Sequence, residues 1–256
     1  MESLHWKTMR LALILPCLFT IVYSSFIQRF HLLGSSDSNV EECSAVDQLQ
    51  VRHCLEGYFG GFGYNASETL PPYVQFDMDT KGLLVQYETG GIDRICGNFQ
   101  SFEDCNKDYT NTTCLSRRSF QSMFNVSFEE AELYSVDFPT RDYECVHKKV
   151  LYDNFPCFKS VYQHDSTGVE KCISRVESMI ANGDNACIAM NEYVACTAPL
   201  YGACGNSELR PYVCTVLQMG VPPGYCTGKM PDCNSSPETL PVLPLTLASV
   251  VAMLLK

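Results

Sequence analysis

The chain has 256 residues, a formal net charge of −11 and 15 cysteines. Nucleic acid is bound by basic stripes, so this acidic balance argues against a nucleic-acid partner. It also argues against adsorption to acidic lipid surfaces. Once its predicted terminal signals are removed, roughly 200 residues remain, which is enough for one large domain or two small ones.

The first segment is predicted to be a signal peptide. A basic start is followed by an apolar run from Leu11 to Tyr23, which is too short to span a bilayer and typical of a signal peptide. The small residues Val22 and Ser24 precede the predicted signal-peptide cleavage site, which lies just before Ser25. We therefore predict a signal peptide over residues 1–24 and a flexible leader over residues 25–40. The alternative is an uncleaved signal anchor, which the interruption by Pro16 disfavours.

Helical periodicity begins at Glu41. The spacing predicts a helix with two apolar faces, one carrying Cys43, Val46 and Leu49 and the next carrying Val51, Cys54 and Leu55. The run of glycines and aromatics that follows, Gly57 to Pro72, predicts a turn that tucks its aromatic rings into the core. A ligand-binding loop is the alternative. Tyr73 to Tyr87 is the one place where a strand or hairpin is expected.

Helical spacing dominates the rest of the chain. Six further helices are expected: Ile92 to Cys105, one capped by Ser127 and Glu130, one capped by Thr140, Val169 to Ile180 before Asn182-Gly183, one capped by Asp184, and one from Ser207 to Gly220. The predicted fold is therefore all-α, a disulfide-rich helical ectodomain with long loops and at most one small hairpin. It covers residues 41–233, as one unit or as two subdomains with a break near residue 138.

The end of the chain carries the order of signals that directs attachment of a glycosylphosphatidylinositol (GPI) anchor. Small residues at Asn234 to Ser236 are followed by a short polar spacer and an apolar run of about 16 residues, Leu240 to Leu255. We predict attachment at Asn234 and removal of the tail, so that residues 234–256 are an anchor signal. A short helix packed on the protein, or a membrane span, are the alternatives.

Cysteine usage predicts a disulfide framework. Cys17 leaves with the signal peptide, and an even number remains, as an oxidising compartment requires. Zinc is disfavoured because no C-x-x-C pair occurs. The pairing cannot be deduced from the sequence. The predicted bridging residues are Cys43, Cys54, Cys96, Cys105, Cys114, Cys145, Cys157, Cys172, Cys187, Cys196, Cys204, Cys214, Cys226 and Cys233.

Sequons indicate a glycoprotein. Asn65, Asn111 and Asn125 each begin an N-x-S/T triplet, which places them on the surface of a secreted chain. A fourth triplet at Asn234 overlaps the predicted anchor site, so we expect no glycan there.

The cysteine order resembles a known family. The segments that carry the likeness are Cys43 with Cys54, C-G-N-F-Q-S-F-E-D-C from Cys96, T-C-L at Thr113, Y-E-C-V at Tyr143, F-P-C-F at Phe155, N-A-C at Asn185, Y-V-A-C at Tyr193, A-C-G at Ala203 and a last helix between Cys214 and Cys226. This order resembles the nematode secreted domain of unknown function nineteen and, more distantly, the core domain of nematode chondroitin proteoglycans. The resemblance implies an extracellular α-helical disulfide module and carries over no catalytic residue.

Catalytic motifs are weak. His164-Asp165 is the best candidate, because secreted phospholipases use a His-Asp pair with calcium, but its place before Ser166 favours a solvated dipeptide. The dibasic pairs Arg117-Arg118 and Lys148-Lys149 are interpreted as exposed, solvated charges, with proteolytic processing as the alternative. No metal and no cofactor are expected.

The sequence therefore predicts an extracellular, GPI-anchored glycoprotein that acts as a binding module without catalysis. Its expected partner is an extracellular protein or glycan, and the anchor would hold it to the outer membrane leaflet. The alternatives are a secreted, calcium-dependent phospholipase-type hydrolase and a structural coat component.

Overall fold

The structure is a computed structural model that describes residues 43–107, 112–163, 166–221, 226 and 230–234. Throughout these residues the regular structure is helical and no strand occurs, so the prediction of an all-α, disulfide-rich fold is confirmed. The elements are α2 (Ala45–Gly60), α3 (Tyr73–Tyr87), α4 (Thr89–Asn106), the 3₁₀ turn η3 (Thr112–Leu115), α5 (Arg117–Phe124), α6 (Phe128–Val146), α7 (Lys148–Gln163), α8 (Ser166–Ala181), α9 (Ala186–Gly202) and α10 (Leu209–Met219).

The expected hairpin is wrong, because Tyr73–Tyr87 forms helix α3. Pro72 stands at the N-cap in an extended conformation, where its missing N–H costs nothing. Phe76 and Thr80 are both fully buried and lie four residues apart, so one helical face enters the core. Asp77 is buried as well and directly follows Phe76, whereas in a strand two neighbouring side chains would point to opposite faces.

Ser127 caps helix α6 as predicted, since its hydroxyl accepts a hydrogen bond from the N–H of Glu130 at 3.1 Å. The predicted cap at Thr140 is wrong. Thr140 lies inside α6, and its hydroxyl donates to the carbonyl of Val136 at 2.7 Å. The helix continues through Pro139 and ends at Val146, so it is longer than the capping pattern indicated.

The helices predicted around Ile92 and Val169 are present as α4 and α8, and Gly183 ends α8 with a φ of +84°. The cap of α9 is Asn185 rather than Asp184, because the Asn185 side chain accepts the hydrogen bond from the N–H of Cys187 at 2.8 Å. Helix α10 ends before Gly220 as predicted.

Only one of the two predicted apolar faces of α2 is buried. Val46 and Leu49 are each 72% exposed, whereas Val51 and Leu55 are fully buried. The buried face continues into Phe59 and the other aromatic rings of the glycine-rich segment. The sequence interpretation that this segment supplies core aromatics therefore holds in the structure.

The N-terminal core is built largely from aromatic rings. Tyr58 lies with its ring centroid 5.2 to 6.2 Å from six other aromatic rings, mostly edge to face. Buried members of this cluster come from α2, α3, α4, α5 and α6: Phe59, Phe76, Phe99, Phe102, Phe120, Phe124, Tyr134 and Phe138. Such burial supplies most of the stability of these five helices.

All fourteen cysteines predicted to form disulfides do so. The bridges are Cys43–Cys114, Cys54–Cys105, Cys96–Cys145, Cys157–Cys204, Cys172–Cys196, Cys187–Cys226 and Cys214–Cys233. The first three connect residues up to 145 and the other four connect residues from 157 onward, so none joins the two sets. The proposed break into two subdomains near residue 138 stays a prediction, and α6 passes through that position.

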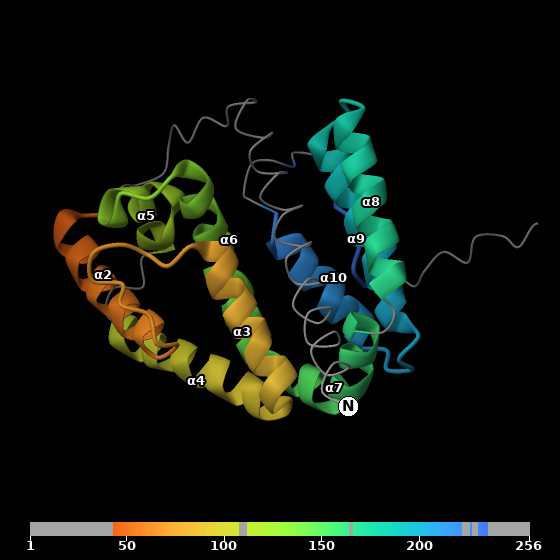
Figure 1. The fold of residues 1–256 in the computed structure, drawn as a ribbon, viewed down its shortest axis with the longest axis horizontal. Coiled ribbons are helices and arrows are strands. Elements are labelled where there is room, and N and C mark those ends of the chain that lie inside the picture. The colour runs from red at the N-terminus through yellow and green to blue at the C-terminus, as the bar shows by residue number, and fades with distance from the viewer. Residues whose placement is uncertain (1–42, 108–111, 164–165, 222–225, 227–229, 235–256) are drawn as a thin grey trace, which may run out of the picture.

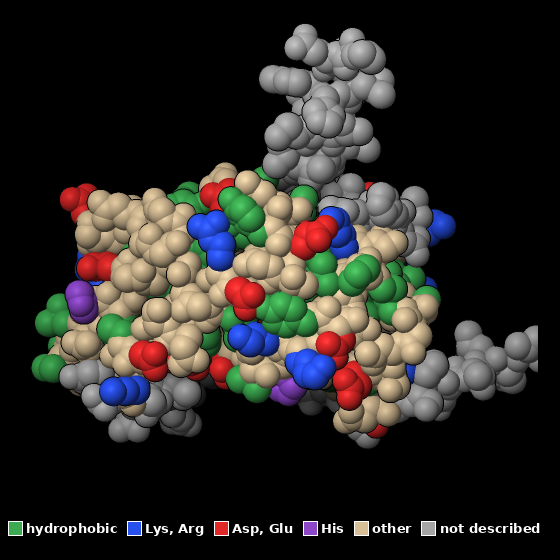
Figure 2. Space-filling model, turned by 90° about the horizontal axis from the view of Figure 1, so that it is seen from below, with side chains coloured by type: hydrophobic (Ala, Val, Ile, Leu, Met, Phe, Trp, Pro, Cys, Tyr) green, Lys and Arg blue, Asp and Glu red, His purple; other side chains and the backbone are tan. Residues whose placement is uncertain are grey.

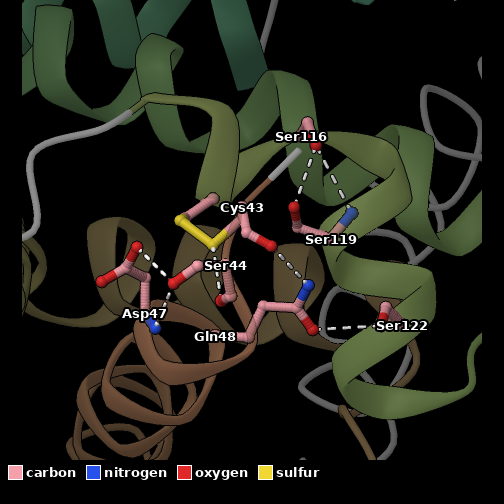
Figure 3. The surroundings of a disulfide bond; sticks show 8 residues. Cys43, Ser44, Asp47, Gln48, Ser116, Ser119 and Ser122 are labelled. Carbon is pink, nitrogen blue, oxygen red and sulfur yellow. Dashed lines mark hydrogen bonds between the residues drawn. A yellow bond between two sulfur atoms is a disulfide. The ribbon is translucent and has the colours of Figure 1, made fainter. Parts of the chain in front are cut away.

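The first bridge fastens the start of α2 to the segment before α5 (Figure 3). Around it, Ser44 caps α2 by accepting from the N–H of Asp47. Gln48 donates to the carbonyl of Cys43 at 3.0 Å and accepts from the hydroxyl of Ser122 at 3.0 Å. The polar contacts and the disulfide thus hold α2 against α5.

Figure 1 shows α2 to α5 on one side of the molecule and α8 to α10 on the other, with α7 below α10. A buried cluster joins the two sides, since Ile92 of α4 packs with Leu151 and Phe155 of α7 and with Leu209 and Val213 of α10. On the face drawn in Figure 2, Lys and Arg side chains lie next to Asp and Glu side chains rather than in a continuous basic stripe.

Candidate functional site

A cavity of about 280 Å³ lies where the two sides of the molecule meet. Its size is near the lower end of the roughly 300–1,000 Å³ that is usual for ligand pockets. Seven helices contribute to its lining, α3, α4 and α6 from one side and α7, α8, α9 and α10 from the other. The cavity is therefore formed only when these seven helices pack together.

Most of the cavity wall is apolar. Each of these helices turns an apolar face toward its neighbours, and part of each face lines the cavity. These residues are Leu84, Val85, Ile92, Ile95, Val136, Leu151, Phe155, Phe158, Val169, Met190, Val213, Val216 and Leu217. Such a wall suits the apolar body of a small molecule.

Helix α3 adds an ion pair to this wall. The ammonium of Lys81 lies 2.6 Å from a carboxylate oxygen of Asp77, one helical turn away. Asp77 is only 5% exposed, so this pair is largely removed from water. Thr80, between them, donates its hydroxyl to the backbone carbonyl of Asp77 at 2.9 Å.

Helix α6 adds a second charged group to the wall. The guanidinium of Arg141 donates to Asp137 at 3.1 Å and to Glu144 at 3.4 Å. The hydroxyl of Tyr73 donates to the same oxygen of Asp137, also at 3.1 Å. Asp137 and Arg141 are 7% and 9% exposed, whereas the side chain of Glu144 is 27% exposed, so this network is buried at Asp137 and Arg141 and partly open to solvent at Glu144.

Burial shifts the proton affinities of this network. Desolvation raises the pKa of Glu144 above its usual range, although Arg141 opposes the shift. Burial alone would lower the pKa of Arg141, but Asp137 and Glu144 hold it well above its usual range. The pKa of Tyr212, which stacks on Tyr143, is raised by burial and by Glu144, so it stays a neutral phenol.

Four buried polar atoms of the cavity-lining residues have no hydrogen-bond partner among the described residues. They are Oδ2 of Asp137, Nε of Arg141, the hydroxyl of Thr197 and the hydroxyl of Tyr212. A buried polar atom without a partner costs about 1–3 kcal/mol, so most such atoms in folded proteins are paired. Four at one cavity, brought together from α6, α9 and α10, indicate a place that takes up a further polar group.

The predicted glycosylation sites that the structure describes are at the surface. Asn65 and Asn125 are both exposed, while Asn111 lies outside the described residues. Asn65 accepts from the hydroxyl of Ser67, the third residue of its own sequon, at 2.8 Å. Asn234 is exposed, and the rest of the predicted anchor signal lies outside the described residues.

His164 and Asp165 also lie outside the described residues, as do the predicted signal peptide and leader. Arg117, which the sequence suggested to be a solvated charge, is instead paired with Glu132 at 2.7 Å, and both side chains are nearly buried. That part of the interpretation was wrong. Lys148 and Lys149 are exposed as predicted.

The cavity residues were missed by sequence reasoning. The one signal for them is the pattern D-x-x-x-R-x-x-E at Asp137, Arg141 and Glu144, which puts three charges on one helix face. On its own this pattern is typical of a solvent-exposed ion pair, because only the packing of α10 and α3 against α6 buries it. Thr197 and Tyr212 carry no pattern at all.

Among the described residues no helix is both long and apolar enough to cross a membrane. Comparison with family models, with curated protein sequences and with solved structures finds no match to this chain. The function is therefore argued from the cavity and from the sequence signals alone.

Proposed function

We propose that this protein is an extracellular binding module of the cell surface, a GPI-anchored glycoprotein that holds a small ligand in the cavity between its two sides and catalyses no reaction. The cavity, with its apolar wall and its four unpartnered polar atoms, is the observation that carries the proposal. The sequence analysis led us to expect an extracellular protein or glycan as partner. The largely apolar wall favours a small molecule instead.

The seven disulfides support an extracellular location, because such bridges persist in oxidising compartments. The predicted signal peptide, sequons and anchor signal support the outer membrane leaflet as its place. The resemblance of its cysteine order to a nematode secreted domain also supports an extracellular location. A binding role needs a rigid cavity, and disulfides on both sides of it favour rigidity.

The location is tested by expressing the full chain in animal cells and treating them with phosphatidylinositol-specific phospholipase C. We expect surface protein to pass into the medium on treatment. Retention at the surface would contradict the anchor, and protein already free in the medium would show a soluble secreted form.

The binding role is tested on the purified mature protein with the neutral fluorescent probe N-phenyl-1-naphthylamine. We expect saturable binding at one site and its loss in Val216→Trp, because Val216 lines the cavity on α10. The matched control is Val146→Trp, since Val146 is 70% exposed and does not line the cavity. Absence of saturable binding, or equal binding by both variants, would contradict the proposal.

A further inference from the structure

We infer that the polar part of this cavity recognises the neutral hydroxyl head of an amphipathic molecule, whose apolar body lies against the remaining wall. The inference rests on the proposed binding function and names the class of ligand. It is carried by two observations: the chemistry of the unpartnered atoms and the balance of charge around them.

The unpartnered atoms on α6 are one donor and one acceptor. Nε of Arg141 can only donate, and Oδ2 of Asp137 can only accept when the carboxylate is ionised. Their side chains already share a hydrogen bond of 3.1 Å, so these two atoms belong to one joined group. A hydroxyl both donates and accepts, so a single hydroxyl can satisfy the two of them.

The other two unpartnered groups are themselves hydroxyls, on Thr197 of α9 and Tyr212 of α10. Each can donate to, or accept from, the same ligand oxygen or a second one. Both residues are nearly buried, at 3% and 4% exposure. The head group is therefore approached from three helices that belong to different parts of the chain.

A charged head would satisfy these groups less well than a hydroxyl. Every cation of the cavity wall already faces a carboxylate: Lys81 with Asp77, Arg141 with Asp137 and Glu144, and Lys159 with Glu88. A ligand carboxylate would lie beside Asp137 and Glu144 with no cation left to pair it. A ligand ammonium could pair with the surplus carboxylate, but it would lie beside the Arg141 guanidinium, and because it only donates it would leave Nε of Arg141 without an acceptor. Burying an unpaired charge is far more costly than burying a hydroxyl.

The test uses four probes with the same ten-carbon body: 1-decanol, decanoate, decylamine and decane. Each is titrated against bound N-phenyl-1-naphthylamine on the purified mature protein at neutral pH. We expect 1-decanol to displace the probe at the lowest concentration, at least tenfold below decanoate and decylamine. Tighter binding of decanoate or decylamine would overturn the inference, and equal binding of decane would show a purely apolar cavity.

Two isosteric variants test the polar contacts. Thr197→Val and Tyr212→Phe remove hydroxyls that have no partner among the described residues, so we expect both to fold. Each should weaken 1-decanol about fivefold and leave decane unchanged. Tyr87→Phe is the control, because Tyr87 is 45% exposed and does not line the cavity. Unchanged 1-decanol affinity in both cavity variants would overturn the inference.

The outcomes separate this inference from the proposed function. If N-phenyl-1-naphthylamine binds at the cavity but the four head groups are not distinguished, the binding function stands and the ligand class is wrong. If the probe does not bind at all, both fail together.

Discussion

The hydroxyl of Tyr134 on α6 donates a hydrogen bond of 2.7 Å to the backbone carbonyl of Pro71, which immediately precedes the cap of α3. Tyr134 is fully buried, and its ring packs edge to face on Phe59 and Tyr73. This contact holds the start of α3 against α6, the two helices that supply the charged groups of the cavity.

Replacing Tyr134 with Phe should destabilise the protein by about 1–3 kcal/mol, because it leaves the buried carbonyl of Pro71 without its donor. The control is Tyr87→Phe, because the Tyr87 side chain is 45% exposed and its hydroxyl can be solvated in both states. We expect that variant to be neutral. Urea unfolding of both measures the difference, and equal effects would contradict the account.

A pair of adjacent glycines provides a second test of the packing of α3 against α4. A methyl group at Gly91 would lie 2.7 Å from the carbonyl carbon of Leu83 and 2.9 Å from the backbone nitrogen of Leu84. Backbone cannot move aside cheaply, so Gly91→Ala should cost about 1–3 kcal/mol in the free energy of unfolding.

The control for this prediction is Gly90→Ala. A methyl group there meets only Cβ of Tyr87, at an ordinary 3.8 Å. Because alanine favours the helix over glycine, Gly90→Ala should be neutral or stabilise by up to about 1 kcal/mol. The unfolding temperature should therefore fall in Gly91→Ala and stay the same or rise in Gly90→Ala. An equal fall in both variants would contradict the packing of α3 against α4 described here.

Lys-C digestion tests the division of the disulfides. Cleavage after every lysine of the denatured, unreduced chain should leave two disulfide-linked species, one with the cysteines up to Cys145 and one with those from Cys157 onward. The glycans expected at Asn65, Asn111 and Asn125 should all be on the first. Mass spectrometry identifies the disulfide-linked peptides and the glycosylated asparagines. A single linked species would show a disulfide between the two sets of cysteines and contradict the prediction.

The pKa of Glu144 predicts a pH dependence of stability. Because burial raises this pKa in the folded state, the native protein holds the proton more tightly than the unfolded chain, and the contribution of this group falls as pH rises above its ordinary value of 4.5. Glu144→Gln removes that contribution. The stability of the variant relative to the original protein should therefore increase between pH 4 and pH 7.

Glu103 and Glu130 have raised pKa values as well, for which burial is the main cause, so only the difference between variant and original protein is informative. Glu177→Gln is the control, because Glu177 is exposed on α8. Urea unfolding across this pH range gives the comparison. A difference that stays constant with pH, or declines, is the result that would refute this reading of Glu144.

The sequence predicted the helical class and the full set of bridging cysteines, because periodicity and cysteine parity are local signals. It misjudged Tyr73–Tyr87, where a glycine and several β-branched residues masked a helix that tertiary burial of Phe76 and Thr80 stabilises. It also gave this first helix two apolar faces, of which only the one that carries Val51 and Leu55 enters the core, while Val46 and Leu49 are exposed.

The cavity could not be predicted for a related reason. Its polar groups come from residues as distant along the chain as Tyr73 and Tyr212, and only the tertiary packing of their helices brings them to one wall. The spacing of Asp137 and Arg141 in the sequence is typical of an ion pair on a helix, but it was not singled out. It could not indicate that the pair is buried or that two of its atoms lack partners.

The most direct test of the central claim is the stoichiometry of radiolabelled 1-decanol, measured by equilibrium dialysis on the mature protein and on variants that narrow the cavity from either side. Val216→Trp fills it from α10 and Val85→Trp from α3, while Val146→Trp leaves it unchanged. We predict one molecule bound per chain in the original protein and in Val146→Trp, and none in the two cavity variants if circular dichroism shows them folded. One molecule bound in folded Val216→Trp and Val85→Trp would place the ligand elsewhere and contradict the account.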